Sequence, residues 1–282
     1  MQQTFALKWH LLSWLMRRPG RASTGIALGY DQGFDSGPML DYVYENRAQG
    51  RFPLGALIDR VYLNAVGWRA IRARKALLKT VLQLEIAALR GQAQPVVVLD
   101  VAAGPGRYWL ELAQELQATG ALAPGDLQVI CRDLDARGLA LGRERAARLG
   151  VSNVRFETGD ATDARSLGAV DPRPQIVVVS GLYELFANAG LIRQSMQAIA
   201  GILPPGGRLI FTTQVQHPQL EFIARVLVNR DGQPWEMVCR SLDETAALAR
   251  SAGFTVLHSQ LEHVGLFGIT VCEKAADPGP RP

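Results

Sequence analysis

The fold is decided by residues 96–107, which read VVVLDVAAGPGR. The first six form an apolar, β-branched run, as expected for a strand that is buried on both faces of a parallel sheet. A loop of small residues follows, and helical periodicity then continues to residue 118. Glycines let a ligand approach the backbone closely, and the amides at the start of a helix can donate hydrogen bonds to it. The stretch therefore predicts a ligand-binding strand–loop–helix unit.

Strand and helix patterns alternate after this unit. Apolar runs predict further strands at 127–131, 154–157, 175–180 and 208–213, with helices at 136–149 and 188–203. This alternation predicts βαβ units with right-handed crossovers. Two later runs, 254–257 and 267–272, are joined by a short loop, which suits an antiparallel pair at the sheet edge. We therefore expect an α/β fold with a doubly wound, mostly parallel seven-stranded sheet, an antiparallel last strand and an N-terminal helical extension.

The chain before residue 95 has a different character. Residues 36–90 carry apolar side chains at helical spacing, and residues 91–95 (GQAQP) break that pattern. We expect three parts, which are an N-terminal helical segment (1–94), a ligand-binding domain (95–275) and a disordered tail (276–282). Residues 1–95 hold thirteen Lys/Arg against six Asp/Glu. This surplus favours anionic partners such as phosphate-bearing substrates, lipid headgroups or RNA, and it equally fits a solvated helix face.

The apolar run at residues 5–16 is shorter than the roughly 18 to 20 residues that a transmembrane helix needs. Its arginines, Arg17 and Arg18, follow the run instead of preceding it, which argues against a signal peptide. The three cysteines show no metal-ligand spacing, so we expect a cytoplasmic protein without a metal site. Two tryptophans among leucines leave two interpretations open. The helix packs on the protein's own core, or residues 5–18 contact the inner face of a membrane.

The loop after the first strand also indicates the class of ligand. A dinucleotide fingerprint, G-x-G-x-x-G, needs a third glycine for close packing of helix on strand, and counting from Gly104 this position is Trp109. A phosphate-binding Walker loop would need Gly-Lys-Ser/Thr, which this loop lacks. An acidic residue, Asp100, precedes the loop. Its carboxylate suits a cationic ligand such as S-adenosylmethionine (SAM), which carries an amino group and a sulfonium.

Residues 100–106 (DVAAGPG) resemble the first motif of class I SAM-dependent methyltransferases, acid-x-Gly-x-Gly-x-Gly, with Ala102 in place of the first glycine. Later motifs follow in the expected order. The resemblance implies a Rossmann-like methyltransferase fold, in which Asp133 binds the ribose hydroxyls and Asp160 accepts from the adenine amino group. Asp135 competes with Asp133 for the ribose role. The cofactor-binding residues that the resemblance implies are Asp100, Ala102, Ala103, Gly104, Gly106, Asp133, Leu134, Asp160, Ala161 and Ser180.

A narrower resemblance rests on three other stretches. Residues 41–46 (DYVYEN), 67–72 (GWRAIR) and 217–221 (HPQLE) are similar to a bacterial methyltransferase family whose members are often fused to an α/β-hydrolase. We expect no hydrolase domain in this chain.

Methyl transfer requires alignment of the nucleophile with the methyl group and, for a protonated nucleophile, a base. The catalytic candidates near the strand ends are Tyr183, Glu184 and His217. Two of them have alternatives, because Tyr183 also suits a wall of the adenine pocket and His217 also suits a helix start. The N-terminal helices are expected to form a lid over the cofactor. Basic residues at helical spacing on that lid are expected to face an anionic substrate, and they are Arg69, Arg72 and Lys75.

Together these features predict a SAM-dependent methyltransferase that acts on an anionic small-molecule or lipid-type acceptor. An RNA-modifying methyltransferase is one alternative. Residues 180–184 (SGLYE) lack the Asn/Asp-Pro-Pro-Tyr/Phe motif of base amino methylation, so nucleic acid is not the expected partner. A non-catalytic module that binds SAM or a protein partner is the other alternative, because Ala102 replaces a motif glycine and the sequence offers no obvious base.

Overall fold

The computed structural model describes residues 2–90, 95–121, 123 and 125–275, and for residues 2–6 it describes the backbone alone. The predicted tail, 276–282, lies outside the described residues. The chain forms two compact units. The N-terminal unit comprises Met1–Ala73 and Gln216–Val238, and the sheet unit comprises Arg74–Val215 and Cys239–Pro282. Within the described ranges, no helix is both long enough and apolar enough to cross a membrane.

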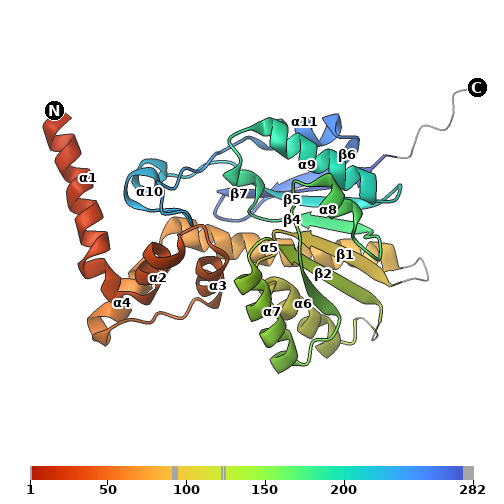
Figure 1. Cartoon of the computed structure of the whole chain (residues 1–282), viewed down its shortest axis with the longest axis horizontal. Coiled ribbons are helices and arrows are strands. Elements are labelled where there is room, and N and C mark those ends of the chain that lie inside the picture. Colours follow the sequence, from red (N-terminus) through yellow and green to blue (C-terminus); the bar gives the residue numbers. More distant parts are fainter. Residues whose placement is uncertain (1, 91–94, 122, 124, 276–282) are drawn as a thin grey trace, which may run out of the picture. The chain divides into compact units, whose positions relative to one another are not determined.

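The sheet unit is built on one seven-stranded sheet (Figure 1). Its strands are β1 (Val96–Val101), β2 (Leu127–Asp133), β3 (Val154–Thr158), β4 (Ile176–Val179), β5 (Arg208–Gln214), β6 (Phe254–Leu261) and β7 (Phe267–Lys274). They lie in the order β3-β2-β1-β4-β5-β7-β6. Strands β1 to β5 are parallel, and β7 is antiparallel to both of its neighbours. The predicted mostly parallel sheet with an antiparallel last strand is confirmed.

Helices cover both faces of this sheet (Figure 1). On one face lie the second half of α5 (Val66–Leu89), α6 (Arg107–Ala118) and α7 (Ala136–Leu149). On the other face lie α8 (Ala164–Gly168), η3 (Tyr183–Leu185), α9 (Ala189–Ile202) and α11 (Leu242–Ser251). The arrangement is therefore doubly wound, as the alternation of strand and helix patterns predicts.

The two helical layers explain the apolar run of β1. Val96 and Val98 belong to the core on the α5–α6–α7 side, and Val97, Leu99 and Val101 belong to the core on the opposite side. All six residues of β1 are buried. Because successive side chains of a strand point to opposite faces, a central strand between two helical layers must be apolar at nearly every position.

Strand β6 is longer than the expected 254–257, since it continues to Leu261. Its second half is exposed and lies at the sheet edge, where His258, Ser259 and Gln260 pair with β7 through their backbones. A register shift between Val256 and His258 interrupts the ladder. An exposed edge strand needs no apolar alternation, so its polar half gave no strand pattern in the sequence.

The N-terminal unit is helical. It contains α1 (Gln2–Arg17), the short 3₁₀ helix η1 (Pro19–Ala22), α2 (Thr24–Gln32), α3 (Gly37–Glu45), α4 (Phe52–Leu63), the start of α5 and α10 (Leu220–Val226). Asp59 of α4 has no solvent exposure and ties several of these elements together. Its carboxylate accepts from the hydroxyls of Ser23 and Tyr42 at 2.5 Å, and from the backbone N–H groups of Gly25 and Gln49 at 2.8 Å.

The division into units differs from the expected boundary between residues 94 and 95. The boundary lies within α5, between Ala73 and Arg74. The second half of α5 contributes Leu78, Leu82 and Ile86 to the core of the sheet unit. Residues 216–238, which follow β5, fold with the N-terminal helices. A continuous helical pattern in a sequence does not show where the helix changes its packing partners, so the sequence could not place the division between these units.

Candidate functional site

Three residues with left-handed backbone conformation shape the loop after β1. Ala102, Gly104 and Gly106 have φ angles of 60°, 54° and 62°. Glycine adopts such angles without a steric penalty, whereas an L-residue such as alanine does so at a cost of about 1–2 kcal/mol. The loop thus turns at Ala102 in a conformation that glycine favours, although glycine is absent there.

Gly106 precedes α6 where no larger side chain fits. A Cβ at this position would lie 2.9 Å from a ring carbon of Phe156 and 3.0 Å from Sγ of Cys131. The start of α6 therefore packs directly on residues of β2 and β3. Since α6 follows β1 after a short loop, its first backbone N–H groups lie near the carboxyl end of β1 and can serve a ligand there.

Asp133, the last residue of β2, ties three strand ends together. Its Oδ2 accepts from the backbone N–H of Gly104 at 2.8 Å, and its Oδ1 accepts from that of Asp135 at 2.8 Å. Its backbone carbonyl accepts from the N–H of Gly159 at 3.1 Å. The loops after β1, β2 and β3 thus meet at one residue. The competing candidate, Asp135, instead caps α7 by accepting from the N–H groups of the first turn.

The residues next to this junction are an exposed apolar side chain, Leu134, and a hydrogen-bonded carboxylate, Asp160. Leu134 follows Asp133 directly, and it is 68% exposed. Asp160 follows β3 and accepts at Oδ1 from the N–H and the hydroxyl of Thr162, both at 2.8 Å. These bonds lower the pKa of the Asp160 carboxyl. The carbonyl of Ala161 accepts from the Ser195 hydroxyl.

Asp100 is buried beneath the loop, and its carboxylate has no exposure. Its Oδ2 accepts from the Tyr108 hydroxyl and, at 2.7 Å, from the indole N–H of Trp109. Its Oδ1 is buried without a hydrogen-bond partner among the described residues. Burial raises the pKa of Asp100 to about 7, the two aromatic donors oppose this, and the charge of Asp133 adds to it.

Tyr108 and Trp109 are site residues that the sequence reasoning missed. Both lie in the first turn of α6, and both donate to the acidic residue of the first motif. The sequence showed Trp109 only as the residue that excludes a third glycine. An aromatic donor pair eight and nine residues after a strand-end acid, on the helix that begins over it, is the signal that could have found them.

The end of β4 carries a second polar group of residues. The backbone N–H of Gly181 donates to the Thr212 hydroxyl at 2.9 Å, and that hydroxyl donates to Oε1 of Glu184 at 2.8 Å. The guanidinium of Arg74 lies 3.8 Å from the same Oε1. Glu184 is 5% exposed, and its Oε2 is buried without a hydrogen-bond partner in the part of the chain that the structure describes. Burial raises the pKa of Glu184, while Arg74 opposes the rise.

Tyr183, one of the expected catalytic residues, belongs to the core on the α9 side of the sheet. Its side chain is 2% exposed, and its hydroxyl lies 3.2 Å from that of Ser195 on α9. It packs with the residues on the α9 side of the sheet, including Phe211. The phenol is therefore held among core side chains, and both its catalytic role and its alternative role as a wall of the adenine pocket stay predictions. Ser180, the expected cofactor residue at this strand end, is half-buried.

His217 lies in the N-terminal unit, where its ring packs on α5. A Cβ at Gly67 would lie 2.6 Å from Nε2 of His217, so a larger residue there would have to displace the ring. Its Nδ1 accepts from the backbone N–H of Gln219 at 3.1 Å, just before α10. Burial lowers the pKa of His217. This geometry matches the alternative interpretation of a residue at a helix start, and its role as a base stays a prediction.

The expected basic substrate face divides into two sets. Lys75 forms an ion pair with Glu111 of α6 at 2.8 Å. The ammonium group that was expected to contact the substrate therefore already has a carboxylate partner. Arg69 is exposed, whereas Arg72 is half-buried. Nη1 of Arg72 is buried without a hydrogen-bond partner among the described residues. Burial and the neighbouring charge of Arg69 lower the pKa of Arg72. Of the three expected residues, Arg69 and Arg72 form no ion pair with a carboxylate in the part of the chain that the structure describes.

The comparison with protein families gives a match over nearly the whole chain. A family model described as "Putative methyltransferase" matches residues 1–274. Protein YnbC of Escherichia coli (strain K12) is 42% identical over 268 residues, which are 94% of this chain and 44% of that protein. The chain therefore spans less than half the length of this relative.

Two solved structures with a similar fold are described as methyltransferases. Magnesium protoporphyrin IX methyltransferase (ChlM) from Synechocystis PCC 6803 with bound SAH is similar with a TM-score of 0.59 and 13% identity, over 87% of this chain and 98% of that one. An O-methyltransferase family protein from Burkholderia thailandensis is similar with a TM-score of 0.54 and 17% identity, over 90% of this chain and 72% of that one. At such low identity these two likenesses show the fold alone, and that fold is the Rossmann-like methyltransferase fold.

The raised pKa of Asp100 predicts how stability depends on pH. Between about pH 4, the pKa of an unfolded aspartate, and about pH 7 the folded chain binds the proton more tightly than the unfolded chain. Asp100 therefore lowers stability as pH rises through that window. Asp100→Asn keeps a neutral group and an oxygen for both donors. Relative to the parent, its free energy of unfolding should rise by at most about 1.4 kcal/mol per pH unit.

The measurement is urea unfolding of both proteins across this pH range. Asp171→Asn, a substitution at an exposed loop residue, is the control and should leave the pH dependence of the parent unchanged. Parallel stability curves for the parent and Asp100→Asn would contradict the assignment of a protonated, buried Asp100.

Proposed function

The chain belongs to this methyltransferase family, and from that premise we propose that it transfers the methyl group of SAM to an anionic small-molecule or lipid-type acceptor. The observation that carries the proposal is the junction at Asp133, where the loops after three neighbouring strands share one residue. In open α/β sheets, ligands bind at the carboxyl ends of the strands. The structures of ChlM with bound SAM and SAH support this choice of cofactor.

The residues at the junction suit the parts of SAM. Each carboxylate oxygen of Asp133 accepts one backbone hydrogen bond and keeps a lone pair for a ribose hydroxyl. The exposed side chain of Leu134 offers an apolar surface to the adenine ring. Asp160, whose pKa is lowered, is an acceptor for the adenine amino group. The buried Oδ1 of Asp100 has no hydrogen-bond partner among the residues that the structure describes, and a cationic amino group near it would stabilise its ionised form.

SAM supplies an electrophilic methyl group on a sulfonium, and the chain has to position the acceptor and, where necessary, hold its proton. We assign the base to Glu184. Its Oε1 is fixed by Thr212 and lies near Arg74, so the second oxygen has a defined orientation. Burial raises its pKa, and a carboxylate with a raised pKa is a stronger base than an exposed one.

Two variants separate cofactor binding from catalysis. Asp133→Ala removes the acceptor for the ribose hydroxyls and releases the loop after β1, so SAM affinity measured by calorimetry should fall by about a hundredfold or more. Glu184→Gln should bind SAM like the parent, and its turnover to S-adenosylhomocysteine should fall by about a hundredfold.

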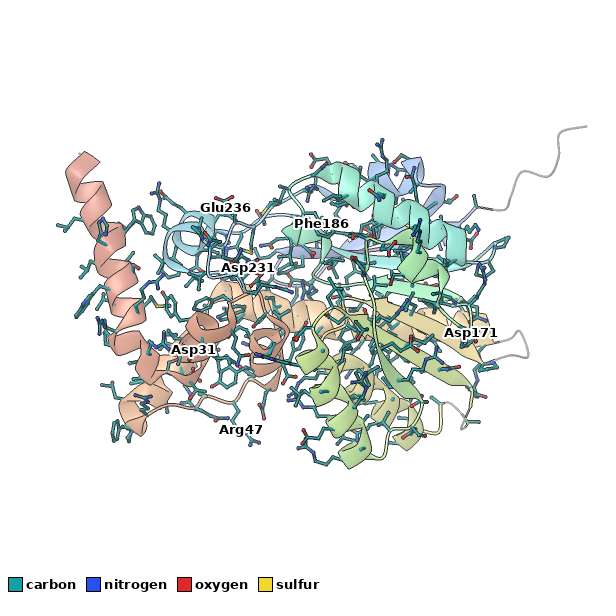
Figure 2. All side chains as sticks on the ribbon, in the orientation of Figure 1. Asp31, Arg47, Asp171, Phe186, Asp231 and Glu236 are labelled. Carbon is teal, nitrogen blue, oxygen red and sulfur yellow. The ribbon has the colours of Figure 1, made fainter. Side chains whose placement is uncertain are left out.

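Asp171→Ala is the matched control. Asp171 precedes β4 and so lies toward the amino ends of the strands, at the far side of the sheet unit from Phe186, which follows η3 (Figure 2). Asp171→Ala should change neither the affinity for SAM nor the turnover to S-adenosylhomocysteine. A parent chain that does not bind SAM contradicts the proposal. A chain that binds SAM and transfers no methyl group to any cell extract is the non-catalytic module instead.

The anionic acceptor is inferred from Arg69 and Arg72. These side chains lie one helical turn apart on α5, and among the described residues no carboxylate forms an ion pair with them. Two like charges at this distance repel each other, and an anion between them would relieve the repulsion. A phosphate or carboxylate on the acceptor has this chemistry, and guanidinium groups bind both in a bidentate manner.

Charge reversal tests this assignment. With labelled SAM and fractionated cell extract, the methylated product should be retained on an anion exchanger. Arg72→Glu should raise the KM for that acceptor about tenfold or more and leave the affinity for SAM within about twofold. Arg148→Glu, at an exposed position of α7, is the control and should leave both unchanged. A neutral product, or an unchanged KM in Arg72→Glu, would refute an anionic acceptor.

A further inference from the structure

Helix α1 presents an apolar face to solvent. Leu7, Leu11, Trp14 and Leu15 are 69%, 56%, 55% and 41% exposed. Leu11, Trp14 and Leu15 follow Leu7 by four, seven and eight residues, which places all four side chains on one side of the helix. Of the two interpretations that the sequence left open for this helix, packing on the protein's own core does not account for these exposed side chains. Other residues of α1, Trp9 and Leu12 among them, are only partly exposed.

Helix α4 presents a second apolar face in the same unit. Leu54, Leu57 and Val61 are 67%, 57% and 68% exposed at a spacing of three and seven residues, and Phe52 at the start of the helix is 84% exposed. Helices α1 and α4 both pack on η1 in the N-terminal unit (Figure 1). We call these exposed side chains of α1 and α4 the apolar surface. Exposed apolar side chains that gather along a helix face mark a site of interaction.

The exposed charges on the two segments that carry the apolar surface have one sign. Residues 7–18 and 51–63 contain five basic residues, Lys8, Arg17, Arg18, Arg51 and Arg60, and all five are exposed. The one acidic residue of these stretches, Asp59, is fully buried and accepts four hydrogen bonds inside the unit. In the described part of the chain, no carboxylate forms an ion pair with any of the five.

We propose that the apolar surface docks the chain on the surface of an anionic lipid bilayer. The leucines, Trp14 and Phe52 would enter the boundary between headgroups and acyl chains, and the five basic residues would meet the lipid phosphates. A second copy of the chain fits this surface poorly, because it would bring five positive charges against five others. Tryptophan and leucine on one helix face, with arginines at the end of the helix, is typical of helices that lie in a membrane interface.

Flotation of the full chain with lipid vesicles tests this proposal. The chain should bind vesicles of phosphatidylcholine mixed with phosphatidylglycerol more strongly than vesicles of phosphatidylcholine alone, and added salt should weaken the binding. Leu11→Ser and Leu57→Ser should each lower the binding constant about tenfold, because each removes one apolar side chain from the interface. Arg51→Gln and Arg60→Gln should each lower it about fivefold on the mixed vesicles only.

Leu84→Ser is the matched control, since Leu84 of α5 is 65% exposed and belongs to the sheet unit. It should leave vesicle binding unchanged, and circular dichroism should show that every variant is folded. Three results would overturn the proposal. In the first, the parent binds neither kind of vesicle. In the second, Leu84→Ser weakens vesicle binding as much as Leu11→Ser does. In the third, the parent forms a dimer that Leu11→Ser dissociates, while neither protein binds lipid.

Discussion

The candidate site depends on the carboxylate of Asp133 and on its place at the end of a central strand. One oxygen holds the loop after β1 through Gly104, the other holds the turn into α7, and the backbone carbonyl holds the loop after β3 at Gly159. A charged acceptor with several backbone donors is among the stronger hydrogen-bonded arrangements in proteins. It fixes three loops whose flexibility would otherwise have to be lost when a ligand binds.

Around this junction the sheet unit places two further acids in environments that raise their pKa. Asp100 is held by Tyr108 and Trp109 beneath the loop, and Glu184 is held by Thr212 and Arg74 at the next strand end. Buried acids with perturbed pKa values are concentrated at functional sites. The first is suited to respond to a cationic ligand, and the second is suited to accept a proton. Cofactor binding and proton transfer are thereby assigned to different strands of one sheet.

The sequence predicted the seven strands because a central parallel strand must be apolar on both faces, and it predicted Asp133 and the glycine loop because their positions follow from the strand ends. It did not reveal which side chains meet across elements. Lys75 pairs with Glu111 of another helix, and the Tyr183 hydroxyl lies in the core beside Ser195. The polar half of β6 gave no alternating pattern. The boundary within α5 was hidden because helical periodicity continues through it.

The most direct measurement is a crystal structure of the chain with S-adenosylhomocysteine. The account predicts one molecule at the carboxyl ends of β1, β2 and β3, with both ribose hydroxyls on the Asp133 carboxylate, adenine beside Leu134 and Asp160, and the amino group toward Asp100. Density for the ligand in another cavity, or a bound molecule whose ribose makes no contact with Asp133, would contradict it.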